Sequence, residues 1–522
     1  MTENALAFLL GLFLCGVLYR GANTPFVIQI LGYGAALVLL LSLFVSLLPI
    51  HFRNVAPVRS IAAVALVVAL LALLISGLVG LIHIPLETWL SLPARSYYHD
   101  VVAWHQRTHP DLVSLALSLD TVGTTQAVWV AVTALAVCVG TSSLPRPLIM
   151  KLLAVFVFLA IVEAVLGLLQ FALSGPAFLS YSPTPQNRAI GTFINRNHFA
   201  TWLAMSLPIV LLRTSGAFTF QSTEGSSHSG YWQVWWGFAV VLIATALLAS
   251  ASRAGSSAAL FVAATTLCVI ATRKMPGKSS LIPLAIVTTL ALLISETILP
   301  RFALVFSDDA LRQSSAGRAI MYARALDSAK EFFPVGSGLG SFSIAFQRFQ
   351  PPELGGLFIE HVHNDYIQLL FETGATGVLI LALLAMSTVA TAISLFRHRD
   401  NFRQIAPAIG CFLGAAAFAF HSLFDFPAHI PSVAIAATFL FTAALRLSVP
   451  EAGNERRKPA VKASEPIATT PVQPVIETQR ARRTRDTAAR QHDPALEALF
   501  HPRDPQAMVK TPLEKTTDKP AD

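Results

Sequence analysis

Charge is the scarcest property of this 522-residue sequence, because only 13% of its residues are Asp, Glu, Lys or Arg. Soluble domains carry about 25% charged residues, so the composition excludes an ordinary soluble protein. Cysteine is also rare, and its four copies all lie in apolar runs, where small core residues are expected rather than disulfides or metal ligands. The net charge of +8 comes without a basic and aromatic surface module, so we predict no nucleic-acid partner.

Hydrophobic runs are what the sequence has in abundance, since 54% of its residues are hydrophobic. Apolar runs of about 18 or more residues are typical of transmembrane helices. We therefore predict an all-α, polytopic membrane protein with about twelve spans. The expected spans are 5–19, 26–49, 60–84, 124–140, 149–173, 198–213, 234–251, 255–272, 281–299, 366–395, 405–422 and 430–447. The first span lacks the basic start and cleavage site of a signal peptide, so we expect it to be a transmembrane helix.

Short basic connections indicate the orientation in the membrane, because cytoplasmic loops are rich in Lys and Arg. Four such connections share one side when the N-terminus is cytoplasmic: 51–59, 146–151, 273–278 and 397–403. The opposite orientation would carry all four across the membrane. We therefore predict cytoplasmic termini and two long outer segments, about 85–123 and 300–365.

The chain divides into three expected parts. Residues 1–190 are N-terminal transmembrane helices, and 191–447 form a second transmembrane region that includes the large periplasmic loop 300–365 before the tenth span. Within this loop, 317–333 has polar and apolar positions at helical spacing, which predicts a helix on the outer membrane face. The segment 450–522 is rich in Pro, Thr and charge and poor in aromatics, so we expect a disordered cytoplasmic tail.

Polar side chains gather on the predicted outer side, although polar groups at membrane level are expensive and usually functional. The clusters are Asn195, Arg196, Asn197 and His198; Arg253; Arg318; His361, His363, Asn364 and Asp365; and His421, Asp425 and His429. Each also has a structural explanation. An arginine at a helix end can extend toward headgroups, and an asparagine before a helix can cap it.

One polar stripe is expected to descend from the outer loop into the tenth span. His361, Asp365, Gln368 and Glu372 follow helical spacing, which places them on one face. A functional site and a structural ion pair are both compatible with this stripe.

Two other motifs have plain interpretations. GSGLGSF (336–342) is expected to be a turn rather than a nucleotide loop, because its spacing is not G-x-G-x-x-G and no strand precedes it. His361-x-His363 with Asp365 resembles part of a metal site but lacks a third imidazole or thiolate, so we predict no metal.

The outer clusters together suit one kind of substrate. Arginine offers a fixed fork that binds phosphate oxygens, and a neutral histidine accepts a proton near pH 7. A lipid-linked diphosphate donor needs both groups. The sequence therefore favours group transfer from such a donor at the outer face.

On these residues the chain resembles the O-antigen ligase and O-antigen polymerase superfamily. The ligase signature is His, then Asn, Ser or Gln, nine residues, Gly, two residues, and Gly, Thr or Tyr. His363, Asn364, Gly374 and Gly377 fill it completely. GTFINRNHFA, SRAG and HSLFDFPAHIP are similar to the family's other outer-face motifs and occur in the same order. The resemblance covers about residues 190–445.

The resemblance implies an inverting, metal-independent and cofactor-free glycosyltransferase of the GT-C type in the bacterial inner membrane. Its donor is a glycan on undecaprenyl diphosphate, and its site faces the periplasm. Family arginines that grip the diphosphate correspond to Arg253 and Arg318, with Arg196 as a third candidate. The family histidine that activates or positions the acceptor hydroxyl corresponds to His363. Supporting positions are Asn364, Asp365, Glu372, Asn197 and Asp425.

Other functions remain compatible with a chain of this class. Ligases, exopolysaccharide polymerases and protein O-oligosaccharyltransferases share the architecture, so the acceptor can be a lipid A core, a growing polysaccharide or a protein. A secondary transporter, similar to relatives labelled bicarbonate transporters, would place polar groups near the midplane, often within inverted repeats. Here they gather at one face and no repeat is visible. A non-catalytic scaffold would leave the arginines and histidines unexplained.

Overall fold

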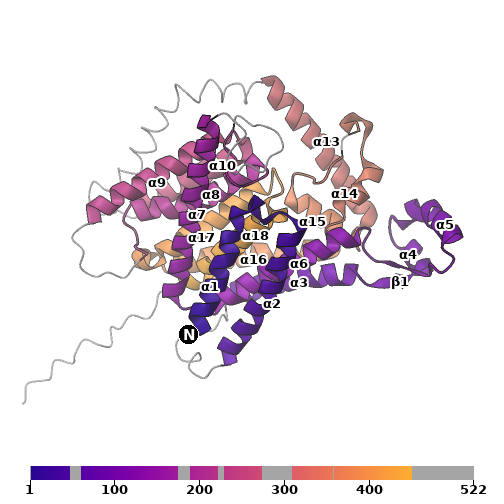
Figure 1. The fold of residues 1–522 in the computed structure, drawn as a ribbon, viewed down its shortest axis with the longest axis horizontal. Coiled ribbons are helices and arrows are strands. Elements are labelled where there is room, and N and C mark those ends of the chain that lie inside the picture. The colour runs from indigo at the N-terminus through magenta and orange to yellow at the C-terminus, as the bar shows by residue number, and fades with distance from the viewer. Residues whose placement is uncertain are drawn as a thin grey trace, which may run out of the picture. The chain divides into compact units, whose positions relative to one another are not determined.

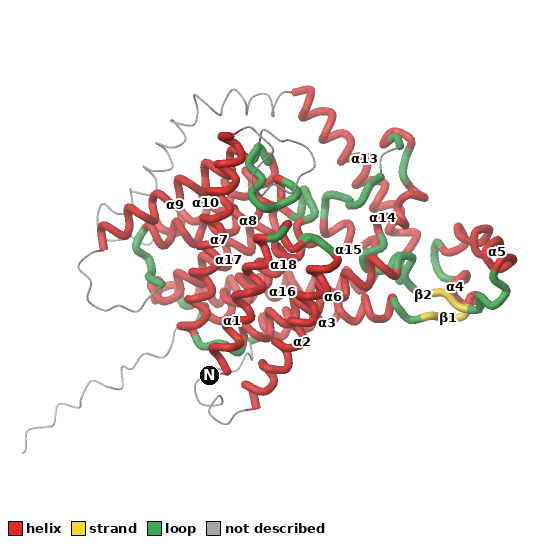
Figure 2. The backbone as a smooth tube through the Cα atoms, viewed as in Figure 1, coloured by secondary structure: helices red, strands yellow, loops and turns green. Residues whose placement is uncertain are grey.

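The computed structural model describes residues 2–47, 60–173, 188–220, 229–272, 308–356 and 358–449. The chain divides into the units Met1–Ala452 and Gly453–Asp522. The second unit and the tail predicted over 450–522 lie outside the described residues. The described part of the first unit is almost entirely helical (Figures 1 and 2), as the hydrophobic runs predict.

Eleven of the twelve predicted spans fall on long helices, and the ninth, 281–299, lies outside the described residues. These helices are α1 (Thr2–Cys15), α2 (Pro25–Leu47), α3 (Ile61–Gly80), α6 (Thr121–Ser142), α7 (Arg146–Leu173), α8 (Arg196–Thr214), α9 (Ser229–Ala249), α10 (Arg253–Thr272), α16 (Ala375–Arg397), α17 (Phe402–His421) and α18 (Pro431–Leu447). Within the described residues, eight helices are long and apolar enough to cross a membrane. An all-α polytopic membrane protein is thereby confirmed, and the number twelve stays a prediction.

The tenth predicted span, 366–395, is two helices rather than one. The short helix α15 (Asp365–Thr373) ends at Gly374, which has a φ of +55°, and α16 begins at the next residue. A Cβ atom on Gly374 would lie 2.3 Å from the carbonyl oxygen of Pro334. That oxygen accepts a hydrogen bond of 2.9 Å from the backbone N–H of Ala375. The helix breaks here because only glycine combines this backbone conformation with so close an approach.

Helix α8 lies at the centre of the bundle and packs against α9, α10 and α17. Nearly all of its side chains are buried, and small residues let its neighbours approach closely. A Cβ on Gly255 of α10 would meet the Ala200 side chain at 2.4 Å, and one on Gly414 of α17 would meet the Met205 carbonyl oxygen at 2.5 Å. Close packing on several sides makes α8 a rigid support for the residues at its N-terminal end.

The first of the two segments predicted to be outer contains a small hairpin that the all-α prediction missed. Strand β1 (His83–Pro85) pairs antiparallel with β2 (Ser114–Ala116). Between them lie α4 (Leu86–Ser91), η4 (Arg95–Tyr98) and α5 (His99–Thr108). Buried Arg95 donates to the Leu117 carbonyl oxygen at 2.6 Å and lies 5.0 Å from the centroid of the Trp89 ring. These contacts hold the segment together, and three-residue strands leave no periodicity to detect.

The second segment predicted to be outer contains the expected helix, since 317–333 falls almost wholly within α13 (Asp308–Phe332). The 336–342 segment is a turn, as expected, and its Ser337 and Gly338 amides donate to the backbone carbonyls of Phe371 and Glu372 at the end of α15. Short helices fill the remaining connections: η1 (Gly16–Leu18), η2 (Arg20–Ala22), α14 (Phe342–Ala345), η6 (Phe346–Phe349), η7 (Pro352–Leu354), η8 (Arg399–Asn401) and η9 (Pro427–His429).

Candidate functional site

Three of the predicted outer clusters meet around the ring of Phe426. The ring centroid of Phe426 lies 4.2 Å from that of His361, 4.9 Å from that of His363 and 4.9 Å from that of His198. These histidines come from the loop before α15 and from the first turn of α8, and Phe426 follows α17. The structure thus brings together segments that are more than 200 residues apart in the chain.

The backbone at His363 turns sharply before α15 begins. His363 has a φ of +58°, a left-handed conformation that is uncommon outside glycine and costs roughly 1 kcal/mol or more. The Tyr322 hydroxyl of α13 donates to its carbonyl oxygen at 2.6 Å.

Asn364 connects α15 to the loop after α17. Its side-chain oxygen accepts from the backbone N–H of Tyr366 at 3.0 Å, which caps the helix. Its amide nitrogen donates to the carbonyl oxygen of Leu423 at 3.0 Å. The next residue, Asp365, donates its backbone N–H to the carbonyl oxygen of Ser422 at 2.9 Å. The signature asparagine therefore fixes the position of its histidine neighbour relative to residues 422–425.

His363 is paired with Asp425, which lies 62 residues away, through Nδ1 and Oδ1 at 2.8 Å. The Asp425 side chain is fully buried, whereas that of His363 is 33% exposed. Burial raises the pKa of the Asp425 carboxyl, but the hydrogen bond with His363 and the nearby imidazoles of His198 and His421 outweigh it. The net pKa lies below the ordinary range, so Asp425 is ionised. An ionised carboxylate places the neutral imidazole's proton on Nδ1 and leaves Nε2 able to accept another.

A second histidine–aspartate pair lies beside the first. His429 Nδ1 is 2.9 Å from Asp365 Oδ1, and the Asp365 Oδ2 accepts from the Ala428 backbone N–H at 3.0 Å. Burial lowers the pKa of His429, but the bond and charge of Asp365 outweigh it and raise the net pKa. On the other side of His429, its Nε2 lies 2.9 Å from Gln368 Nε2. Asp365 is thus part of a polar network within the protein.

Glu372 ends this network and holds the turn at 336–342. It accepts hydrogen bonds from Gln368 Nε2 at 3.0 Å, from the backbone N–H of Gly340 at 2.8 Å and from that of Phe342 at 3.3 Å. The predicted stripe of Asp365, Gln368 and Glu372 does share one face of α15. All the contacts of the Glu372 carboxylate are structural, which favours the structural alternative for this residue.

His361 is packed inside the same network. Its Nδ1 lies 3.3 Å from Gln368 Oε1, and its ring lies 4.6 Å from that of His429 between centroids. Burial and the neighbouring charge of His429 hold the pKa of His361 well below its ordinary value. Across the described ranges, no group of three or more His, Cys, Asp or Glu side chains is arranged to hold a metal ion.

Arg196 and Arg253 lie at the adjoining N-termini of α8 and α10. The Ser252 hydroxyl donates to Asn197 Oδ1 at 2.8 Å, so Asn197 joins the two helix ends. Arg196 Nη1 is buried and has no hydrogen-bond partner among the described residues, and Arg253 is half-buried. Two helix N-termini and two guanidinium groups make this region favourable for an anion.

Arg318 approaches from α13 on the other side of the site. Its Nη1 donates to the carbonyl oxygen of Phe424 at 2.9 Å, next to Asp425. The side chain is half-buried. Arg318 therefore contacts the residue next to Asp425, and Arg196 lies near His198, whose ring contacts Phe426.

Sequence reasoning missed the partners that hold the predicted residues in place. Phe426, Tyr322 and Thr201 are residue types that are common in apolar helices and loops, and nothing in their local sequence singles them out. Only the close contacts of the folded chain identify them.

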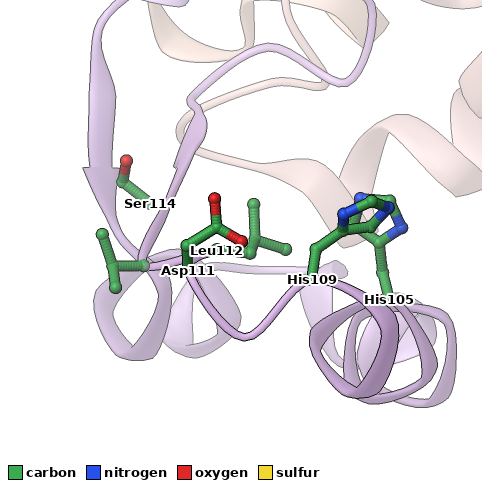
Figure 3. A pocket seen from close by; sticks show the side chains of 6 residues that line it. His105, His109, Asp111, Leu112 and Ser114 are labelled. Atoms are coloured by element: carbon green, nitrogen blue, oxygen red, sulfur yellow. The ribbon is translucent and has the colours of Figure 1, made fainter.

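A separate cavity of about 340 Å³ lies at α5 and the segment that follows it. Figure 3 shows the imidazoles of His105 and His109 lying against each other, with Asp111 across from them. The ring centroids of the two histidines are 4.6 Å apart. The lining of this cavity contains none of the predicted site residues.

The fold and site define a polytopic membrane protein in which a histidine–aspartate pair lies among arginines at one end of the helices. Residues 238–383 match the family model described as O-antigen ligase. The match includes Arg253, Arg318 and the whole signature from His363 to Gly377, while Arg196 and Asp425 lie outside it. No curated protein matches the chain.

Proposed function

We propose that the protein transfers or polymerises a glycan from undecaprenyl diphosphate onto an acceptor hydroxyl at the periplasmic face of the inner membrane. The observation that carries the proposal is the His363–Asp425 pair, in which a buried carboxylate fixes one imidazole nitrogen while the side chain stays partly exposed. The match of residues 238–383 to the O-antigen ligase family model provides the context for this pair.

In the proposed reaction, His363 is the general base. Its Nε2 removes the proton of the acceptor hydroxyl as the acceptor oxygen bonds to the anomeric carbon of the glycan. The bond from that carbon to the diphosphate breaks on the opposite face, so the configuration inverts. Asp425 stabilises the imidazolium that forms, as a buried carboxylate does for a catalytic histidine in other enzymes. A base of this kind contributes roughly 10²–10⁴-fold to the rate.

The arginines bind the leaving diphosphate. Its negative charge grows as the glycosidic bond breaks, and fixed positive groups stabilise that charge without rearrangement. Arg253, Arg318 and Arg196 are the residues we assign to this role. They supply the positive charge from the chain itself, so we expect transfer to continue in the presence of a metal chelator.

The test is transfer in vitro by the purified protein with an undecaprenyl-diphosphate-linked glycan and a chelator. Lipid A core, a glycan with a free non-reducing end and a serine-containing protein are offered separately as acceptors. Product on one of them supports the proposal and identifies the acceptor class. No product on any acceptor, or dependence on an added metal ion, contradicts it.

The periplasmic side of the proposal has its own test. In a cysteine-free background, a membrane-impermeant thiol reagent on intact cells should label Ser314→Cys and miss Ser464→Cys. The reverse pattern would place the site on the cytoplasmic face.

A further inference from the structure

Asp425 lies between two imidazoles, one at each carboxylate oxygen. Oδ1 is bonded to His363 and accepts the Phe426 backbone N–H at 3.0 Å. Oδ2 has no hydrogen bond within the described residues, but His421 Nε2 lies 3.9 Å from it. That nitrogen likewise has no hydrogen bond there. Both side chains are 0% exposed, and a buried carboxylate needs nearby positive or donor groups to stay ionised.

Thr201 of α8 contacts the other ring nitrogen of His421. Its hydroxyl oxygen lies 2.6 Å from His421 Nδ1 and 2.8 Å from the carbonyl oxygen of Asn197, and it has one proton to donate. If that proton goes to Nδ1, neutral His421 carries its own proton on Nε2, facing Asp425. If it goes to Asn197, the His421 proton moves to Nδ1 and a lone pair faces the carboxylate. The ionised carboxylate favours the first arrangement, because it attracts an N–H and repels a lone pair.

We propose that Thr201 and His421 are positioning residues for the catalytic pair. Thr201 donates to Nδ1 of His421, and the Nε2–H of His421 supports the second oxygen of Asp425. Asp425 then stays ionised and oriented with its first oxygen on His363. This inference rests on the proposed function, because it assigns the pair a role in the transfer step. Neither residue is placed on the diphosphate, so the arm formed by Thr201 and His421 should affect turnover and leave donor binding alone.

Other charged groups surround the arm and remain in every Thr201 and His421 variant described below. The imidazoles of His198 and His363 act on Asp425, and the charges of Asp365 and Arg318 act on His421. A change in rate or pH dependence caused by the arm must therefore appear while these charged groups stay the same.

Loss of the Nε2–H should change both the rate and its pH dependence. Without that partner, the Asp425 carboxylate interacts more strongly with a proton on His363, so the protonated, inactive base persists to higher pH. We expect kcat to fall at most roughly 10-fold, because this 3.9 Å contact between an N–H and a buried carboxylate contributes no more than a hydrogen bond to a charged group. The acidic limb of the pH–rate profile should move to higher pH, with KM for the donor unchanged.

Two matched pairs of variants test the arm. His421→Gln keeps an amide N–H near the position of Nε2, whereas His421→Asn reaches only the position of Nδ1. Thr201→Ser keeps the hydroxyl, whereas Thr201→Val keeps the shape without it. The glutamine and serine variants should resemble the wild type. The asparagine variant should show the full loss and pH shift, and the valine variant a smaller change in the same direction.

The measurement is kcat and KM of glycan transfer across pH, with His363→Ala alongside. If His421→Gln and His421→Asn lose activity equally with an unshifted profile, His421 only fills space and the arm is overturned. If the wild type transfers no glycan, or His363→Ala transfers normally, the proposed function itself fails and the arm fails with it. An active wild type with an inactive His363→Ala therefore separates the two failures.

Discussion

Two histidine–aspartate pairs of this protein differ in almost every respect except residue type. His99 and Asp100 are neighbours in the sequence, lie 3.4 Å apart and are 68% and 104% exposed. His363 and Asp425 are separated by 62 residues, lie 2.8 Å apart, and the aspartate is fully buried. Exposed pairs are screened by water and contribute little, whereas a buried carboxylate can fix the tautomer of its partner. Burial, rather than proximity in the sequence, makes a histidine–aspartate pair useful for catalysis.

The largest expected effect comes from removing the buried pair's histidine. His363→Ala should lower glycan transfer by roughly 10²–10⁴-fold, because the proposed general base is lost. Binding of the undecaprenyl-diphosphate-linked glycan should persist. Transfer and donor binding are measured on purified protein, with His99→Ala as the exposed control. Equal activity of His363→Ala and His99→Ala would show that the two pairs do not differ in function.

The next effect comes from removing only the charge of the buried carboxylate. Asp425→Asn should lower kcat on the order of 10²–10³-fold, because the amide supports neither the tautomer nor the imidazolium. Raising the pH should not restore the rate, since asparagine does not ionise. Asp100→Asn should behave as the wild type. The pH–rate profiles of both variants provide the comparison. Full activity of Asp425→Asn would show that Asp425 contributes only to packing.

Arginine variants should have a smaller effect, on donor binding rather than turnover. Arg318→Ala and Arg253→Ala should each weaken donor affinity roughly 10-fold, as expected for one charged hydrogen bond. Lysine should rescue only in part, because a point charge does not reproduce the guanidinium fork. Arg324→Ala, an exposed arginine on the same helix as Arg318, is the control. Donor binding that is insensitive to both site arginines would assign the diphosphate elsewhere.

The smallest effect should be a pH dependence of stability from the second buried pair. The pKa of His429 is raised in the folded protein, above the unfolded value of about 6.5. Its contribution is therefore fully present below the unfolded pKa and is lost as the pH rises through the folded pKa. The thermal midpoint of the purified protein should fall over this range, and His429→Gln should flatten the fall. His99→Gln should leave the pH dependence as it is in the wild type.

The sequence predicts the helices and singles out a catalytic candidate because both leave local patterns. Hydrophobic runs mark the long helices, and the signature spacing marks His363 and Asn364. Orientation rules place the polar clusters on one side, and hydrogen bonds such as those of Asn364 with Leu423 and of Ser252 with Asn197 do join these clusters.

What the sequence misses depends on contacts between distant segments. No local sequence pattern indicates that His363 pairs with Asp425, or that Thr201 contacts His421, which is 220 residues away. The break at Gly374 is hidden because an apolar run continues across it and hydropathy does not register a backbone angle. Glu372 looks like a charge at membrane level, and only the fold shows the backbone amides that surround it.

The helix α15 also explains why the signature has a fixed length. Its nine residues span about 13 Å, and they separate two anchored ends, the capping Asn364 and the bend at Gly374. The length of α15 therefore fixes the distance between these two ends. Deleting or inserting one residue would turn one end by about 100° relative to the other. The His363–Asp425 bond and the bonds of Glu372 to the turn at 336–342 then could not form together. The spacer therefore tolerates changes of residue type far better than changes of length, whatever acceptor the enzyme serves.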